Sequence, residues 1–147
     1  MKKQGLKPSF FIQFGYPGET KEDIALTIRM INEHLPHEIG ISVSYPLPGT
    51  LFYDRVKADL QQKTNWTDSD EMALMFSNTF SPGYYKQLHK YVHQNYHAHL
   101  ATYNLLKLLK NPFKPDVKKI RKAVSVLYHA PATLIERYKL NQLEKAL

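Results

Sequence analysis

Two short apolar runs near the start of the chain have the pattern of buried strands. Residues 9–14 read Ser-Phe-Phe-Ile-Gln-Phe, and residues 39–44 alternate Ile, Ile and Val with small residues. Thr20 and Thr50 follow these runs and are suited to cap helices, because an N-cap hydroxyl accepts a hydrogen bond from the first turn. The order strand, helix, strand, helix, with strands about thirty residues apart, is typical of βαβ units in a parallel sheet.

The segments that leave the two strands resemble each other. Pro17-Gly18-Glu19-Thr20 follows the first strand and Pro48-Gly49-Thr50 follows the second. Gly permits the positive φ of a tight turn, and Thr then opens a helix. Such repeated units build a (β/α)₈ barrel, whose ligand-binding loops follow the strands, although other parallel α/β sheets contain them too.

The rest of the chain has helical periodicity. Ser81-Pro82 is a helix start, and no Gly or Pro interrupts the apolar repeat from residue 84 to about residue 109, which predicts one long helix or two joined with little break. Two more helices are expected on either side of Pro131. The chain is therefore divided into residues 1–62 with the strands, a connector at 63–80, and a helical extension at 81–147.

Charge also separates these parts. The chain has 147 residues and a net charge of +7; residues 1–80 carry 8 Lys and Arg against 10 Asp and Glu, whereas residues 81–147 carry 12 against 3. The basic cluster Lys118-Lys119-Ile120-Arg121-Lys122 lies on a predicted helix beside apolar residues, which favours an amphipathic helix with a solvated basic face. An anionic membrane surface is a possible partner, and nucleic acid is the less favoured one.

Two absences limit the function classes. No stretch approaches the roughly 18 apolar residues of a membrane span, and no signal-peptide pattern is visible, so a cytoplasmic location is expected. The chain has no Cys, which excludes disulfides, a Cys nucleophile and an iron–sulfur cluster held by its own thiolates.

Two parallel strands need neighbours at their edges and helices over both faces. Residues 1–62 are therefore expected to be the last portion of a larger α/β domain. Met1 would then be an internal or truncated start.

The residues from Phe10 to Thr20, with Gly-Tyr-Pro-Gly-Glu-Thr after the strand, and those from Ile41 to Thr50, ending in Pro-Leu-Pro-Gly-Thr, resemble the C-terminal half of a radical S-adenosylmethionine (radical SAM) barrel. They are most similar to the cobalamin-binding class that includes anaerobic magnesium-protoporphyrin ester cyclase-like proteins. The resemblance covers residues 5–60. It implies an α/β fold: the last two βα units of a partial TIM-type barrel, followed by an all-helical C-terminal extension.

The resemblance also implies which residues bind a cofactor. In that family the loops after these two strands line the S-adenosylmethionine pocket, and Gln13 occupies a position where many relatives place an aliphatic residue against the adenine. Carried over, the cofactor-binding residues are Gln13, Gly15, Tyr16, Pro17, Gly18, Glu19, Tyr45, Pro46 and Leu47. For Glu19, a structural or ligand-orienting role at a helix N-terminus is favoured over proton transfer.

The chain departs from the family where the chemistry begins. It lacks the Cys-x3-Cys-x2-Cys motif that holds the 4Fe–4S cluster and an Asp-x-His-x2-Gly pattern for cobalamin. The parent protein would be the enzyme, this chain alone would be inactive, and the cluster and cobalamin would belong to the missing N-terminal half of the barrel. No catalytic residue is assigned.

Other interpretations stay open. The alternative function is a non-catalytic basic helical module that binds nucleic acid or an anionic membrane surface. His89, His93 and His97 have the i, i+4 spacing of metal-binding imidazoles, but a polar helix face is favoured, and no metal ligand is assigned.

Overall fold

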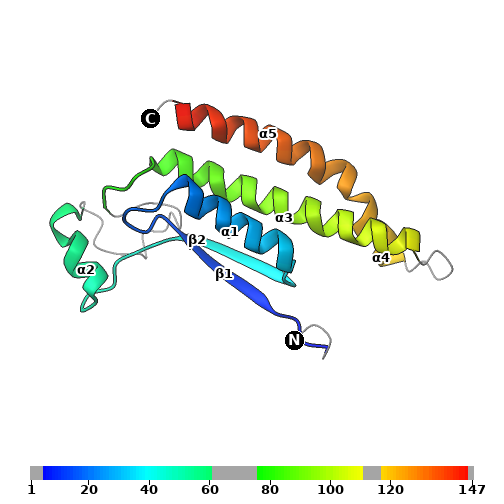
Figure 1. The fold of residues 1–147 in the computed structure, drawn as a ribbon, viewed down its shortest axis with the longest axis horizontal. Helices are drawn as coiled ribbons and strands as arrows, with labels where there is room; N and C mark the ends of the chain where they lie inside the picture. The colour runs from blue at the N-terminus through cyan, green and yellow to red at the C-terminus, as the bar shows by residue number, and fades with distance from the viewer. Residues whose placement is uncertain (1–4, 61–75, 111–116, 146–147) are drawn as a thin grey trace.

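The computed structural model describes residues 5–60, 76–110 and 117–145. Figure 1 shows how the elements follow one another along the chain. They are β1 (Ser9–Phe14), α1 (Lys21–His34), β2 (Glu38–Val43), α2 (Leu51–Val56), the 3₁₀ turn η2 (Lys57–Asp59), α3 (Pro82–Lys110), α4 (Val117–Val124) and α5 (Val126–Lys145). The two expected strands and the long helix from Pro82 are confirmed.

β1 and β2 form a two-stranded parallel sheet, with Ser9 opposite Glu38 and Phe14 opposite Val43. Because side chains alternate between the faces of a strand, one face carries the apolar residues of both strands. On that inner face Ile12 and Phe14 are buried, as are their neighbours on β2. On the outer face, Phe11 is 69% exposed. The sheet therefore has one dry face and one open face.

α1 connects the two strands, and its first turn has the predicted cap. The Thr20 hydroxyl accepts from the Asp23 amide at 3.2 Å, and the Asp23 carboxylate accepts from the Thr20 amide at 2.9 Å. This reciprocal pair is a capping box, which satisfies two amides that the helix leaves unpaired. The helix ends at Leu35, just before Pro36.

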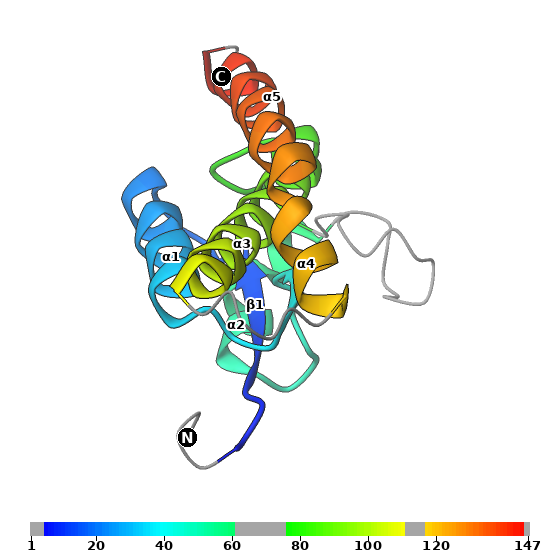
Figure 2. The ribbon, with the colours of Figure 1, turned by 90° about the vertical axis from the view of Figure 1, so that its right-hand side faces the viewer.

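α3 is the central element of the molecule. Figures 1 and 2 show it between α5 on one side and the sheet with α1 on the other. The core joins the inner face of the sheet and α1 to residues of α3 and to Leu140 of α5. The α3 residues in this core are Tyr84, Tyr85, Leu88, Val92 and Tyr96.

A buried hydroxyl fixes α3 against the connection between α1 and β2. Tyr96 is 2% exposed, and its hydroxyl lies 2.8 Å from the Pro36 carbonyl oxygen and 3.0 Å from that of His37. A buried Tyr hydroxyl needs such a partner, since burial removes its hydrogen bonds to water. The contact spans about 60 residues of sequence and holds the amino end of β2 in place.

The predicted partial barrel is wrong. The described residues contain two strands only, and the chain is a small, mostly helical protein. The physical reason is that α3 and α1 cover the inner face of the sheet, while α3, α4 and α5 pack on one another rather than around further strands.

Two details also differ from the sequence prediction. Pro131 lies inside α5, and the helices are instead divided at Ser125, whose hydroxyl donates to the Lys122 carbonyl at 2.8 Å. Within the described part of residues 1–62, the helix predicted after Thr50 consists of the short α2, which ends at Val56, and the 3₁₀ turn η2. Most of the predicted connector at 63–80, including Trp66, lies outside the described residues; the domain boundaries stay a prediction.

Replacing Tyr96 by Phe is expected to lower the free energy of unfolding by about 1–2 kcal/mol, because it removes the hydroxyl donor from the Pro36 and His37 carbonyl groups. Tyr103→Phe is the matched control, since Tyr103 lies on the same helix with an exposed side chain. Urea denaturation followed by circular dichroism measures both. Equal stability of the two variants would contradict the role given to the Tyr96 hydroxyl.

Candidate functional site

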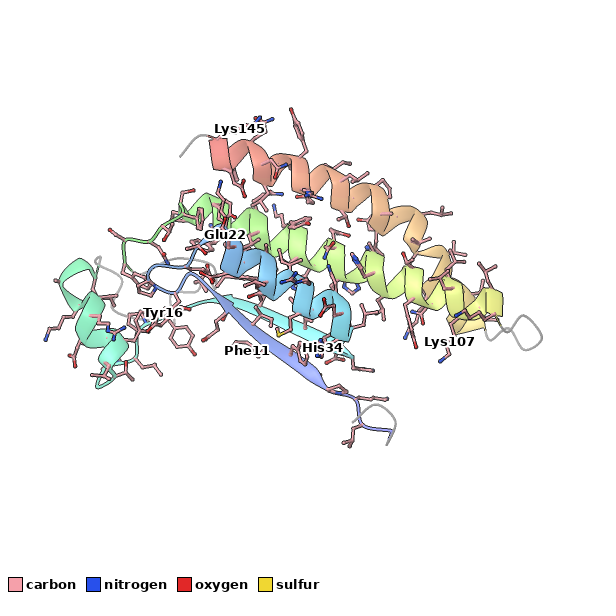
Figure 3. All side chains as sticks on the ribbon, viewed as in Figure 1. Phe11, Tyr16, Glu22, His34, Lys107 and Lys145 are labelled. Atoms are coloured by element: carbon pink, nitrogen blue, oxygen red, sulfur yellow. The ribbon has the colours of Figure 1, made fainter. Side chains whose placement is uncertain are left out.

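The predicted cofactor-binding residues lie together at the carboxyl ends of the two strands. The Ser44 amide donates to the Phe14 carbonyl at 2.7 Å, so the two segments that follow β1 and β2 leave the sheet side by side. The segments Gly15–Glu19 and Tyr45–Leu47 therefore begin at the same end of the sheet. Figure 3 shows Tyr16 at this end, near α2. In parallel sheets, ligands commonly bind outside the carboxyl ends of the strands.

Both segments contain the same kind of turn. The Glu19 amide donates to the Tyr16 carbonyl at 2.9 Å, and Gly18 has a φ of +83°. In the second segment the Thr50 amide donates to the Leu47 carbonyl at 3.2 Å, and Gly49 has a φ of +84°. Pro followed by Gly at positive φ is the arrangement of a type II turn. The repeat seen in the sequence is therefore a repeat of local structure.

The first turn is fixed by the carboxylate of Glu19. Its Oε2 atom accepts from the Gly15 amide at 2.8 Å, and the Gly15 carbonyl accepts from the Asn78 side-chain amide. Burial raises the pKa of the Glu19 carboxyl. The buried Tyr85 hydroxyl lies nearby, outside hydrogen-bond geometry, and burial together with the Glu19 charge raises the pKa of Tyr85. Glu19 therefore holds its own turn in place.

The side chains at this end differ in exposure. Tyr16 is 48% exposed and Tyr45 is 41% exposed. Leu47, Gln13 and Gly18 are also exposed, Pro17 and Glu19 are partly buried, and Gly15 and Pro46 are buried. Tyr16, Tyr45 and Leu47 offer flat or apolar side-chain surfaces. The buried Gly15 and Pro46 shape the backbone beneath them.

Three residues of this region were missed by sequence reasoning. The Tyr16 ring contacts the Phe52 ring, with centroids 5.1 Å apart, and Phe52 meets Phe76 edge-on at 5.5 Å. Asn78 supplies the hydrogen bond to Gly15. Phe52 had a weak signal, as an apolar residue of the helix after Thr50. Phe76 and Asn78 lie in the segment expected to be irregular, where periodicity carries no information.

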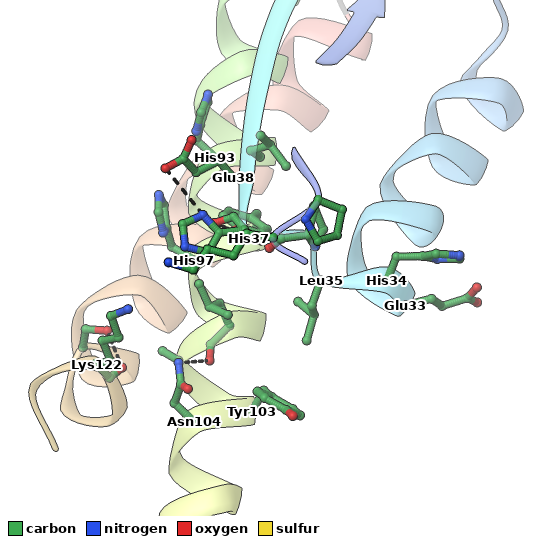
Figure 4. A pocket seen from close by; sticks show the side chains of 18 of the residues that line it. Glu33, His34, Leu35, His37, Glu38, His93, His97, Tyr103, Asn104 and Lys122 are labelled. Atoms are coloured by element: carbon green, nitrogen blue, oxygen red, sulfur yellow. Dashed lines mark hydrogen bonds and ion pairs between the residues drawn. The ribbon is translucent and has the colours of Figure 1, made fainter. Parts of the chain in front are cut away.

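A cavity of about 790 Å³ lies at the other end of the sheet. It is lined by the segment before β1, by the connection between α1 and β2, by α3 and by the junction of α4 and α5, and Figure 4 shows most of these side chains. His37, His93, His97, Asn104 and Lys122 are among its lining residues. None of the predicted cofactor-binding residues lines this cavity.

A row of imidazoles runs along α3 beside the cavity. The rings of His89 and His93 are 4.5 Å apart, those of His93 and His97 are 6.4 Å apart, and His97 stacks on His129 at 5.0 Å. His129 is joined to the Gln94 side chain at 2.8 Å. Within the residues that the structure describes, no three His, Asp or Glu side chains converge as metal ligands.

Burial makes this row resist protonation. It is the main cause that lowers the pKa of His93, and the charges of His89 and His97 lower it further. Burial likewise lowers the pKa of His97 and of His129. The fold therefore favours the neutral form of His93, His97 and His129.

The described helices also contain none that is long and apolar enough to cross a membrane. No family model, curated protein or solved structure matches the chain.

The free energy of unfolding is expected to fall as the pH decreases through about 6.5. At that pH an unfolded His with its ordinary pKa takes up a proton, while the folded His93 stays neutral, so acid favours the unfolded chain. His93→Gln should weaken this dependence. His99→Gln, at an exposed position of the same helix, is the control. Urea denaturation at pH 5.5 to 8 tests this, and identical pH profiles for both variants would contradict the account.

Proposed function

We propose that the chain supplies one wall of the S-adenosylmethionine pocket of a radical SAM enzyme of the cobalamin-binding class. It is inactive until the remainder of the pocket is provided by the missing N-terminal half, on the same or a separate polypeptide. The observation that carries the proposal is the pair of matching type II turns at the carboxyl ends of β1 and β2, with Tyr16, Tyr45 and Leu47 exposed beside them.

The chemistry of these residues supports an adenosyl ligand. Adenine is a flat, largely apolar ring with polar edges, and ligand sites bind such rings with aromatic and aliphatic faces plus a few backbone groups. Tyr16 and Tyr45 offer ring faces, and Leu47 offers an aliphatic one. The exposed turn at Gly18 lets a ligand approach the backbone without meeting a side chain. Glu19 orients this turn through the Gly15 amide and is proposed as a positioning residue.

The other two cofactors of the class do not fit this chain. A 4Fe–4S cluster is held by thiolates, and the chain has no Cys. A 4Fe–4S cluster, and cobalamin with it, would have to be held by the part of the enzyme that this chain does not supply. The proposal includes a cytoplasmic location, where thiols that hold such a cluster are kept reduced.

Titration of the ¹⁵N-labelled chain with S-adenosylmethionine tests the proposal. One wall of a pocket binds weakly, so a dissociation constant of about 1 mM is expected. The amide shifts should move at Gly15–Glu19 and Tyr45–Leu47. Tyr16→Ala with Leu47→Ser should abolish these changes. Tyr103→Ala, at an exposed position of α3, is the control and should retain them.

Two results would overturn the proposal. One is the absence of shift changes at about 10 mM ligand, a concentration that saturates a millimolar site. The other is a set of changes confined to the cavity beside His93 and His97. The DNA immediately upstream gives an independent check, because the proposal expects an in-frame or frameshifted segment that encodes Cys-x3-Cys-x2-Cys.

A further inference from the structure

α4 and α5 carry a row of exposed apolar side chains. The row consists of Val117, Val124, Leu127, Tyr128, Leu134 and Tyr138, and is called the α4–α5 stripe below. Leu127 is 76% exposed and Leu134 is 69% exposed. Within α5, Leu127, Leu134 and Tyr138 are separated by seven and four residues, which places them along one side of that helix.

The opposite side of these helices is packed against α3. Leu140 is buried there. The Gln87 side chain of α3 donates to the Glu136 carboxylate at 2.6 Å, and Gln94 of α3 is joined to His129. Positions 129, 133, 136 and 140 follow the same three- and four-residue spacing on this inner side. The stripe is therefore a second apolar face on helices whose inner face already has its partner.

α4 and α5 are separate helices that meet at Ser125; Ala123 is buried, although Leu127, four residues on, is 76% exposed. The Ser125 amide donates to the Arg121 carbonyl at 3.2 Å, and the His129 amide donates to the Ser125 carbonyl at 3.0 Å. Both bonds have the i to i−4 spacing of an α-helix. The two parts of the stripe therefore follow each other directly along the chain.

Positive charge accompanies the stripe. Residues 117–135 contain four Lys and Arg, at positions 118, 119, 121 and 122, and no Asp or Glu. The two acidic residues of α5 have cationic partners, since Glu136 pairs with Lys139 at 2.9 Å and Glu144 pairs with Lys21 at 3.2 Å. Within the sequence of α4 and α5, the first acidic residue after the basic cluster is therefore Glu136.

We propose that the α4–α5 stripe docks in the plane of an anionic lipid bilayer. The apolar side chains enter the boundary between headgroups and acyl chains, and the cluster at 118–122 attracts the anionic headgroups. Tyr128 and Tyr138 suit this boundary, because a Tyr ring is apolar and its hydroxyl stays wet. α4 lies at the opposite end of the molecule from α2, and α5 runs along the side of α3 away from the sheet, as Figure 1 shows. The stripe is therefore separate from the strand-end turns, and the inference goes beyond the proposed function.

Two other occupants fit less well. A second copy of the chain would bring two basic clusters together, and like charges across an interface repel. Nucleic acid would match the charge, but its backbone gives Leu127 and Leu134 no apolar region to enter. The combination of exposed aliphatic residues and clustered positive charge favours a lipid surface.

Co-sedimentation with vesicles tests the proposal. The chain should bind vesicles of phosphatidylcholine with 30% phosphatidylserine, and bind pure phosphatidylcholine much more weakly. Leu127→Ser with Leu134→Ser should lower the partition coefficient about tenfold or more, because two buried leucines are lost. Leu51→Ser with Leu109→Ser is the matched control, since both leucines are exposed outside the stripe. Circular dichroism checks that each variant is folded.

Each remaining outcome would overturn the proposal. Equal binding by the two double variants would show that the stripe does not enter the bilayer. RNA binding that depends on Arg121 and Lys122, without vesicle binding, would assign the surface to nucleic acid. A dimer in sedimentation velocity that Leu127→Ser with Leu134→Ser dissociates, without vesicle binding, would assign it to a second copy.

Discussion

Burial of the inner face of the sheet against α3 is the interaction on which the structure depends. Two parallel strands have too few hydrogen bonds and too little apolar area to persist alone. Here Ile12, Phe14 and their neighbours on β2 pack into one core with the aromatic face of α3. Tyr96 adds a hydrogen-bonded anchor at the amino end of β2. The turns at the other end can hold a defined geometry because the strands beneath them are fixed in this way.

The sequence predicts the features that depend on neighbouring residues. The strands, the Thr20 capping box and the two Pro-Gly turns each follow from a few adjacent side chains, and the structure has them all. The barrel could not be judged from the same residues, because a βα unit does not encode how many strands stand beside it. Pro131 was read as a helix break, yet α5 continues through it, since packing against α3 outweighs the loss of one hydrogen bond.

In the candidate site, too, some residues could be predicted from the local sequence and others could not. Its turn residues lie together because parallel strands in register end at the same edge, which the strand order already implied. Asn78 and Phe76 reach the site from a segment without periodicity, so their long-range contacts with the turns had no local signal. The exposed apolar residues of α4 and α5 were read only as part of an amphipathic helix. The packing of Leu140 was needed to show that the opposite face is already occupied.

Native-state hydrogen exchange tests most directly whether α3 stabilises the sheet. If the inner face of the sheet and α3 form one cooperative unit, the slowest amides of β1 and β2 and those of the middle of α3 exchange with the same free energy of opening. That free energy should fall equally in both when Val92, buried on α3, is replaced by Ala. The account would be contradicted if the sheet amides exchanged far faster than those of α3 and if Val92→Ala left their free energy of opening unchanged.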